Sequence, residues 1–235
     1  MKSIDAIIVA AGSGARLGAE LPKAFVSLAG RPMYVHSLLQ FAAHTSVGRI
    51  IAVVPETMID QTRGAIRDLG IAKEILVVAG GKHRWQSVQN GVNASSAEWV
   101  MIHDAARPFV STAVIEAVIA LSDHYNAVIA TTPEVDTIRK FVGDRALETV
   151  DRGSVVRVQT PQLFLREHLV SALDHAPFLT SAPTDEAMLM ETAGIPVGIA
   201  SGDPLNFKIT TQEDLALAEA LCEKRGRPDQ PDRTP

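Results

Sequence analysis

The sequence lacks several features that mark common classes of protein. Its 235 residues include one cysteine, Cys222, so no disulfide can form within the chain and we expect a cytoplasmic location. The net charge of -5 argues against a nucleic-acid partner. The first apolar run, 6–9, has only the length of a strand and follows Asp5, so we expect neither a signal peptide nor a membrane span.

Familiar site patterns are absent as well. No Lys-Ser or Lys-Thr pair follows the N-terminal glycines, which excludes a Walker A loop. Gly18 comes one residue too late for a dinucleotide fingerprint and Pro22 interrupts the stretch after it, which disfavours a dinucleotide-dependent reductase. No Ser/His/Asp arrangement stands out, and five histidines lack the spacing of metal ligands: His36, His44, His124, His168 and His175. Zinc and serine-hydrolase chemistry are therefore disfavoured.

The chain is organised around its first strand, 6–9, and the loop that follows. Small side chains and then cations come after this strand: Ala10, Ala11, Gly12, Gly14, Arg16 and Lys23. A glycine-rich turn alone is often only a tight turn. Together with the cations, however, its backbone N–H groups form an anion-binding loop. We expect it to hold a polyphosphate at the carboxyl end of a central strand.

Strand-like and helical patterns alternate along the first half of the chain. The predicted strands are 6–9, 49–54, 74–78, 99–102 and 127–131, and the predicted helices are 33–43, 56–69, 84–94 and 112–122, with Ser111 or Thr112 as an N-cap. This alternation predicts an α/β fold, a Rossmann-like, mostly parallel sheet with helices on both faces.

The alternation of strand and helix patterns stops at 133–157, a stretch that is too polar to be a core element. Gly143-Asp144 between two short alternating runs predicts a hairpin turn. The segment is either a solvated surface hairpin or a projecting dimerisation arm. We favour the arm, and thus a homodimer, because such a hairpin is marginal alone.

The remainder predicts three helices and two short strands. The helices are 166–175, a helix capped by Thr184 that ends at 192, and 212–222, and the strands are 196–200 and 207–209. We expect one domain over 1–225. The proline-rich tail 226–235 should be disordered, either as a bare terminus or as the stub of a linker.

Asp104 is the candidate metal ligand. It follows the strand 99–102 and so falls on the same sheet edge as the glycine loop, where Mg²⁺ could join it to substrate phosphates. The alternative is that Asp104 acts as an N-cap or as the ion-pair partner of Arg107.

Two further segments have both a functional and a structural interpretation. Gly80-Gly81 before a helix admits a flat ligand, with Ser87 within reach of a base edge, yet such a pair is usually only a turn. The segment 184–186 could be a helix cap alone, and Lys208 could lie on the exposed side of an edge strand.

Several motifs together give the chain a family resemblance. They are 10–16, Pro22-Lys23, Gly80-Gly81 with Arg84 and Ser87, 103–108, Asp136-Thr137, Asp151-Arg152, 160–162, 184–187, Asn206 and Lys208. From about Ile4 to Leu221, the sequence resembles the 2-C-methyl-D-erythritol 4-phosphate cytidylyltransferases. The resemblance implies a fold of the nucleotide-diphospho-sugar transferase type.

It also implies roles for individual residues. CTP and a divalent cation, Mg²⁺ or another, would be bound by Ala10, Ala11, Gly12, Gly14, Gly81, Ser87, Asp104 and Ala105, with Asp104 as the metal ligand. The implied catalytic residues are Arg16, Lys23, Arg152 and Lys208. Methylerythritol phosphate would contact Arg107, Thr137, Arg152, Thr160, Thr184 and Lys208, with Thr137 and Arg152 reaching it from the arm of the neighbouring subunit.

One departure and two rival functions remain. Lys82-His83 stands where many relatives carry an acidic residue, so no role is carried over to Lys82. Ribitol 5-phosphate cytidylyltransferases share the loop, the arm and the lysine, although Ala106 and Glu186-Ala187 favour methylerythritol phosphate. A non-catalytic nucleotide-binding module is disfavoured because binding alone would not need Arg16, Lys23 and Asp104 together.

Overall fold

A seven-stranded sheet forms the centre of the computed structural model, which describes residues 2–12, 21–179 and 183–225. Its strands are β1 (Ile4–Val9), β4 (Val47–Val54), β5 (Ile75–Ala79), β6 (Trp99–Asp104), β7 (Ala127–Pro133), β10 (Val156–Leu165) and β11 (Val197–Ser201). They lie in the order β11-β7-β10-β6-β1-β4-β5. Only β10 runs antiparallel to its neighbours β6 and β7, so the prediction of a mostly parallel sheet is confirmed.

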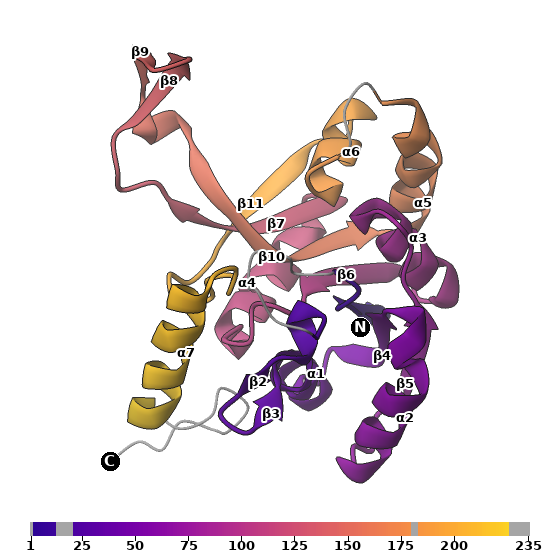
Figure 1. The fold of residues 1–235 in the computed structure, drawn as a ribbon. Coiled ribbons are helices and arrows are strands. Elements are labelled where there is room, and N and C mark those ends of the chain that lie inside the picture. The colour runs from indigo at the N-terminus through magenta and orange to yellow at the C-terminus, as the bar shows by residue number, and fades with distance from the viewer. Residues whose placement is uncertain (1, 13–20, 180–182, 226–235) are drawn as a thin grey trace.

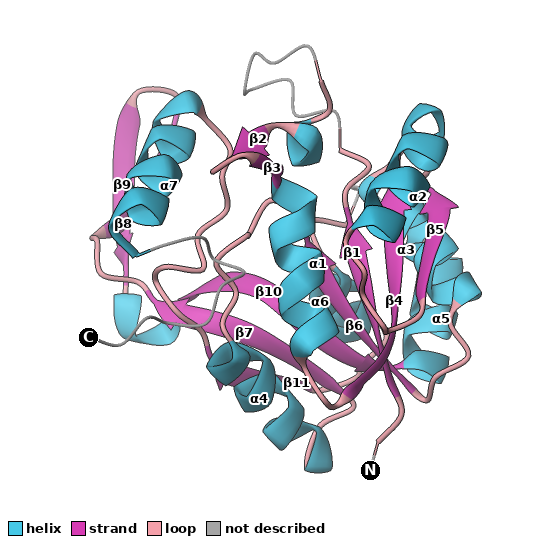
Figure 2. Cartoon of the chain, turned by 90° about the horizontal axis from the view of Figure 1, so that it is seen from below, coloured by secondary structure: helices cyan, strands magenta, loops and turns pink. Residues whose placement is uncertain are grey.

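Helices cover both faces of this sheet (Figures 1 and 2). The helices α1 (Met33–Ala43), α2 (Ile59–Asp68) and α4 (Thr112–Ala120) pack on one face, and α3 (Arg84–Ala94), α5 (Arg166–His175) and α6 (Glu186–Thr192) on the other. Alternation along β1 divides the core accordingly, since Ile4, Ala6 and Ile8 join the first layer and Ile7 the second. Among the described helices, none has the length and apolar character needed to cross a bilayer.

Short elements complete the chain. The hairpin of β2 (Ser27–Leu28) and β3 (Arg31–Pro32) packs with α7 (Gln212–Arg225) around a small third cluster. Single 3₁₀ turns occupy Lys23–Phe25, Glu56–Met58, Leu121–Asp123, Arg152–Ser154 and Ala176–Phe178. The predicted tail 226–235 lies outside the described residues.

One strand was missed, and two predicted details are wrong. The strand β10 was not predicted, because Pro161 and the polar residues around it are atypical of a central strand, and the ladder to β7 indeed shifts register between Val158 and Gln162. Residues 207–209 form no strand, and Ile209 instead donates its backbone N–H to the carbonyl of Ala106 at 2.9 Å. The cap of α6 is Asp185 rather than Thr184, since the Asp185 carboxylate accepts a hydrogen bond from Met188 N at 3.0 Å.

The predicted hairpin is present and projects from the sheet (Figure 1). Its strands, β8 (Ile138–Val142) and β9 (Arg145–Val150), pair antiparallel across a turn at Gly143, whose φ is +59°. The arm leaves the sheet where Pro133 of β7 pairs with Val156 of β10. Most of its side chains are exposed, as its polar sequence predicts.

Helix α3 lies close against the sheet at Gly91. A Cβ at this position would lie 2.5 Å from Ile7 Cγ2 and 3.0 Å from Val53 Cγ2, both of them core atoms. Glycine therefore allows this helix to approach β1 and β4, and its low helix propensity is tolerated for that reason.

We expect Gly91→Ala to lower the free energy of unfolding by about 1–3 kcal/mol, because the added methyl group overpacks the core. Gly64→Ala in α2 is the matched control: a Cβ there meets nothing within 4 Å, so stability should rise by up to about 1 kcal/mol. Urea unfolding of both variants measures the two changes. A Gly91→Ala protein as stable as the wild type would contradict the close approach.

A buried histidine joins β6 to β10. His103 has no exposed surface, its Nε2 lies 3.0 Å from the carbonyl oxygen of Arg107, and its Nδ1 lies 3.1 Å from Thr160 Oγ1. Burial lowers the pKa of His103 to about 4, so the ring is neutral at pH 7.

This histidine makes stability depend on pH. In the unfolded chain a histidine takes up a proton near pH 6.5, whereas folded His103 does so only near pH 4, so the unfolded state binds more protons between these values. The free energy of unfolding should therefore fall by about 2 kcal/mol from pH 7 to pH 5 on account of this residue. His103→Gln should flatten that slope in denaturant titrations, and the exposed control His124→Gln should leave it unchanged. Equal slopes in all three proteins would contradict a neutral, buried His103.

Candidate active site

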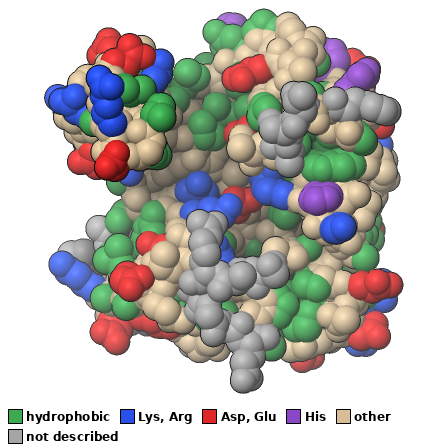
Figure 3. Space-filling model, turned by 45° about the horizontal axis from the view of Figure 1, so that its top comes forward, with side chains coloured by type: hydrophobic (Ala, Val, Ile, Leu, Met, Phe, Trp, Pro, Cys, Tyr) green, Lys and Arg blue, Asp and Glu red, His purple; other side chains and the backbone are tan. Residues whose placement is uncertain are grey.

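A cavity of about 400 Å³ opens where the parallel strands end. Its lining comes from the ends of β1 and β6, the turn after β5, the start of α3, the Lys23 segment and the loop before α7: Val9, Ala10, Ala11, Gly12, Lys23, Ala24, Gly81, Lys82, His83, Arg84, Ser87, Asp104, Ala106 and Lys208. Figure 3 shows basic and acidic side chains together in a hollow of this face. The lining contains four Lys or Arg residues and one carboxylate, which suits a strongly anionic ligand.

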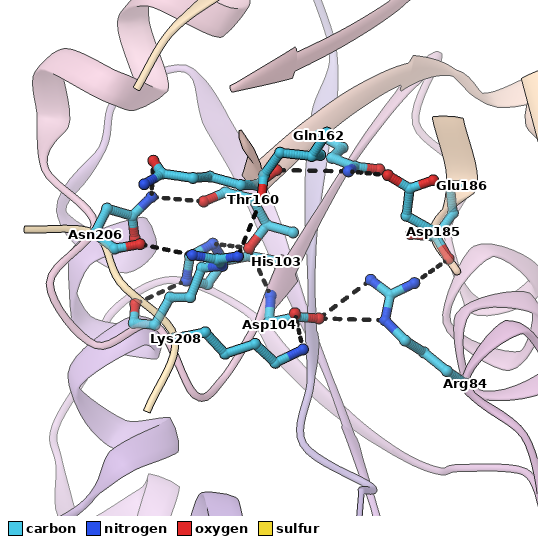
Figure 4. A network of polar contacts seen from close by, with 12 residues as sticks. Arg84, His103, Asp104, Thr160, Gln162, Asp185, Glu186, Asn206 and Lys208 are labelled. Carbon is cyan, nitrogen blue, oxygen red and sulfur yellow. Dashed lines mark hydrogen bonds and ion pairs between the residues drawn. The ribbon is translucent and has the colours of Figure 1, made fainter. Parts of the chain in front are cut away.

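Asp104 lies at the centre of this charge cluster (Figure 4). Its Oδ1 accepts hydrogen bonds from Arg84 Nε at 3.3 Å and Nη2 at 3.1 Å, and its Oδ2 accepts one from Lys208 Nζ at 2.7 Å. Burial alone would raise the pKa of Asp104, but the charges of Arg84 and Lys208 hold it far below its usual range. The carboxylate is therefore an anion at any physiological pH.

Both structural alternatives for Asp104 are wrong. It ends β6, and the next helix begins only at Thr112, so it caps no helix. Its carboxylate pairs with Arg84 and Lys208, whereas the Arg107 guanidinium donates to the carbonyls of Asn206 at 2.8 Å and Val158 at 3.3 Å. Arg107 thus joins the loop before α7 to β10 and does not line the cavity.

Lys208 reaches the cavity from an irregular loop rather than from an edge strand. Asn206 holds this loop, because its Nδ2 donates to Gln159 Oε1 at 3.2 Å and to the carbonyl of Thr160 at 2.8 Å. Thr160 in turn accepts a hydrogen bond from Asp104 N at 3.0 Å. Thr160 therefore lies behind the site, buried, and supports the backbone of Asp104.

Six of the eight residues expected to hold a nucleotide line the cavity, although they differ in their contacts: Ala10, Ala11, Gly12, Gly81, Ser87 and Asp104. Among the described residues, nothing lies within 4 Å of a Cβ built on Gly12, so on that side its backbone is accessible to a ligand. The glycines after β5 are explained by packing: a Cβ on Gly80 would collide with Ala11, and one on Gly81 with Gln86. Ser87 Oγ accepts a hydrogen bond from Gly81 N at 3.0 Å and so fixes this turn.

The other predicted site residues lie away from the cavity or outside the described residues. Ala105 is fully buried, and Thr184 is exposed next to α6. Thr137 and Arg152 lie on the projecting arm, where Arg152 Nη1 donates to the carbonyl of Val135 at 2.9 Å. Gly14 and Arg16 lie outside the described residues.

Sequence reasoning assigned no role to Arg84 or Glu186. Arg84 begins α3 and Glu186 begins α6, and Arg84 Nη1 donates to Glu186 Oε1 at 2.6 Å. Burial raises the pKa of Glu186, and the adjacent Arg84 charge opposes that rise. The signal for Arg84 was its place in the Gly80-Gly81 motif. The signal for Glu186 was its place in the motif 184–187, although nothing in the local sequence indicated that it pairs with Arg84.

The donor set allows a magnesium ion only together with a ligand. Within the described residues there is no group of three or more His, Cys, Asp or Glu side chains that could hold a metal alone. Asp104 supplies one ionised carboxylate in the cavity wall, with lone pairs beyond those used by Arg84 and Lys208. Mg²⁺ commonly binds one or two carboxylates plus substrate phosphates, so the residues present fit this ion.

Comparison with known proteins places the chain in a family. The family model for 2-C-methyl-D-erythritol 4-phosphate cytidylyltransferase matches residues 4–224. The enzyme of that name from Salinibacter ruber is 39% identical over 92% of this chain and 91% of its own length. The one from Geobacillus thermodenitrificans is 38% identical over 94% of this chain and 97% of its own length.

A longer relative and two solved structures agree with this placement. The bifunctional enzyme IspD/IspF of Desulfotalea psychrophila is 36% identical over 97% of this chain, which spans 59% of that protein. The structure of 4-diphosphocytidyl-2C-methyl-D-erythritol synthase from Anaerococcus prevotii matches with a TM-score of 0.83 and 29% identity, covering 94% of this chain and 99% of that one. The cytidylyltransferase from Thermus thermophilus matches with a TM-score of 0.76 and 28% identity, covering 95% and 100%. The chain therefore belongs to the 2-C-methyl-D-erythritol 4-phosphate cytidylyltransferase family and is a nucleotidyltransferase.

Proposed function

We propose that this protein transfers CMP from CTP to 2-C-methyl-D-erythritol 4-phosphate, releasing pyrophosphate and forming 4-diphosphocytidyl-2-C-methyl-D-erythritol for isoprenoid precursor synthesis. The observation that carries this proposal is the cavity at the strand ends, where Arg84 and Lys208 pair with the Asp104 carboxylate and Lys23 lines the same cavity. Such a site suits a triphosphate, and the family name supplies the base and the polyol.

The residues act by positioning and by neutralising charge. A phosphate oxygen of methylerythritol phosphate attacks the α-phosphorus of CTP, and the bond to pyrophosphate breaks. The attacking group is already an anion, so no general base is required. Lys23, Lys208 and Arg16 would stabilise the charge that spreads over the phosphates in the transition state.

We propose Mg²⁺, or another divalent cation, as the cofactor, held by Asp104 together with the phosphates of CTP. When bound, the ion supplies further neutralisation of the triphosphate and of the leaving pyrophosphate. Asp104 is suited to this because it is ionised and is held by Arg84 and Lys208 in the cavity wall.

We also propose a cytoplasmic protein with no nucleic-acid or membrane partner. One cysteine in 235 residues and a net charge of -5 support this location and the absence of a nucleic-acid partner. The partners are then CTP, the polyol phosphate and a second copy of the chain.

The reaction is tested by pyrophosphate release from CTP, ATP or GTP with methylerythritol phosphate or ribitol 5-phosphate. We expect turnover with CTP and methylerythritol phosphate, a kcat/KM for ATP and GTP lower by at least about 100-fold, and no turnover in excess EDTA. A preference for ribitol 5-phosphate would reassign the polyol. Binding of CTP without pyrophosphate release would favour a non-catalytic nucleotide-binding module.

The projecting arm supports the proposal of a homodimer. Phe141, Val142 and Val135 are 73%, 70% and 66% exposed, although they are large apolar side chains. A two-stranded hairpin is marginally stable in water, and a second subunit would cover these side chains symmetrically. Thr137 and Arg152 could then reach methylerythritol phosphate in the partner's cavity.

Complementation tests this shared site. Lys23→Ala and Arg152→Ala should each inactivate the enzyme when alone. If the arm serves the partner's cavity, a heterodimer of the two variants has one intact site. Complete subunit exchange of an equal mixture should then restore about a quarter of wild-type activity. Demonstrated exchange without recovery would mean that each arm serves its own chain.

A further inference from the structure

Glu186 is a buried carboxylate that the proposed reaction does not use. It is 1% exposed, belongs to α6 and does not line the cavity. Its Oε1 accepts the short bond from Arg84, whereas its Oε2 is buried with no hydrogen-bond partner among the described residues. Burying a carboxylate costs several kcal/mol of desolvation, which a partly satisfied ion pair does not fully offset.

Arg84 divides its guanidinium between two carboxylates (Figure 4). Nε and Nη2 face Asp104, and Nη1 faces Glu186. With Lys208, these residues form a continuous row in which the N–O distances are 2.7, 3.1 and 2.6 Å. The row comprises two cations and two anions, so its formal charge is zero.

The charge balance bears directly on Asp104. Without Glu186 the row would carry one net positive charge, and Asp104 would be the remaining carboxylate paired with Arg84 among the described residues. A divalent cation approaching Asp104 would then be repelled at short range, in a partly buried site where such interactions are strong. With Glu186 present, Arg84 Nη1 is bound to Glu186, and the negative charge of the Asp104 carboxylate can attract the divalent cation.

We propose that Glu186 is a positioning residue of the nucleotide site: by binding and neutralising Arg84, it keeps Asp104 oriented and available to the divalent cation that accompanies CTP. This inference rests on the proposed function, because it takes Asp104 as the metal ligand. It predicts that Glu186 affects metal-dependent binding of CTP without touching CTP.

The structural alternative is that Glu186 only stabilises α6. Asp185 provides the matched control, since it caps the same helix at Met188 N and accepts from Gln162 Nε2 at 3.0 Å, but does not contact Arg84. Asp185→Ala should remove the cap of α6, and so lower the melting temperature, while it leaves the charge row intact.

The measurement is the dissociation constant of CTP by calorimetry, once with saturating Mg²⁺ and once with EDTA. The ratio of the two constants is the coupling between metal and nucleotide. Glu186→Gln, which preserves shape, should lower this coupling by about tenfold while metal-free CTP binds as tightly as before or more tightly. In the Arg84→Gln background, Glu186→Gln should lower the coupling no further. Asp185→Ala should lower the melting temperature and keep the wild-type coupling.

Several outcomes would overturn the inference. They are an unchanged coupling in Glu186→Gln, an equal weakening of CTP binding with and without Mg²⁺, a further loss in the Arg84→Gln background, or the same loss in Asp185→Ala. Should Glu186→Gln fail to fold, Glu186→Asp applies: it keeps the charge but shortens the reach to Arg84, and an unchanged coupling there also overturns the inference. Binding is measured without turnover, so failure of the wild type to release pyrophosphate would overturn the proposed function alone.

Discussion

The ion pairs of the Asp104 carboxylate are the interactions on which the rest of the site depends. Three separate elements meet there: β6 supplies the carboxylate, α3 supplies Arg84, and the loop before α7 supplies Lys208. Because the parallel strands all end at one edge, segments far apart in sequence can converge on this point. The cavity lining around them contains more cations than carboxylates, in a chain whose overall charge is negative, and this excess favours entry of an anionic substrate.

The sequence was informative wherever function depends on the local pattern. The buried strands β1 and β6 could be predicted from their apolar runs. The carboxyl ends of these two strands bring Gly12 and Asp104 to the same edge of the sheet. The loop composition therefore identified both sides of the cavity. The arm was predictable for a different reason, since Gly143 adopts a positive φ in a turn between two exposed, polar strands.

Contacts between residues far apart in the chain could not be predicted from local sequence patterns. Arg84 and Glu186 are 102 positions apart, and an acidic residue at the start of a helix is ordinary in isolation. Lys208 was ambiguous for the same reason, because only its contact with Asp104 separates a site lysine from a solvated one. The strand β10 was hidden because Pro161 interrupts its pairing with β7, so its pattern did not resemble a central strand.

The continuity of β10 has a consequence for engineering. The strand begins at Val156, where it pairs with Pro133 at the root of the arm, and it ends at Leu165, which packs against the core. Between these points Thr160 accepts the hydrogen bond from the Asp104 backbone. Deleting the arm would therefore also remove the first residues of β10, the strand whose Thr160 supports the backbone of Asp104. Changes to the arm are therefore better made by exchanging exposed tip side chains such as Phe141 than by deleting the hairpin.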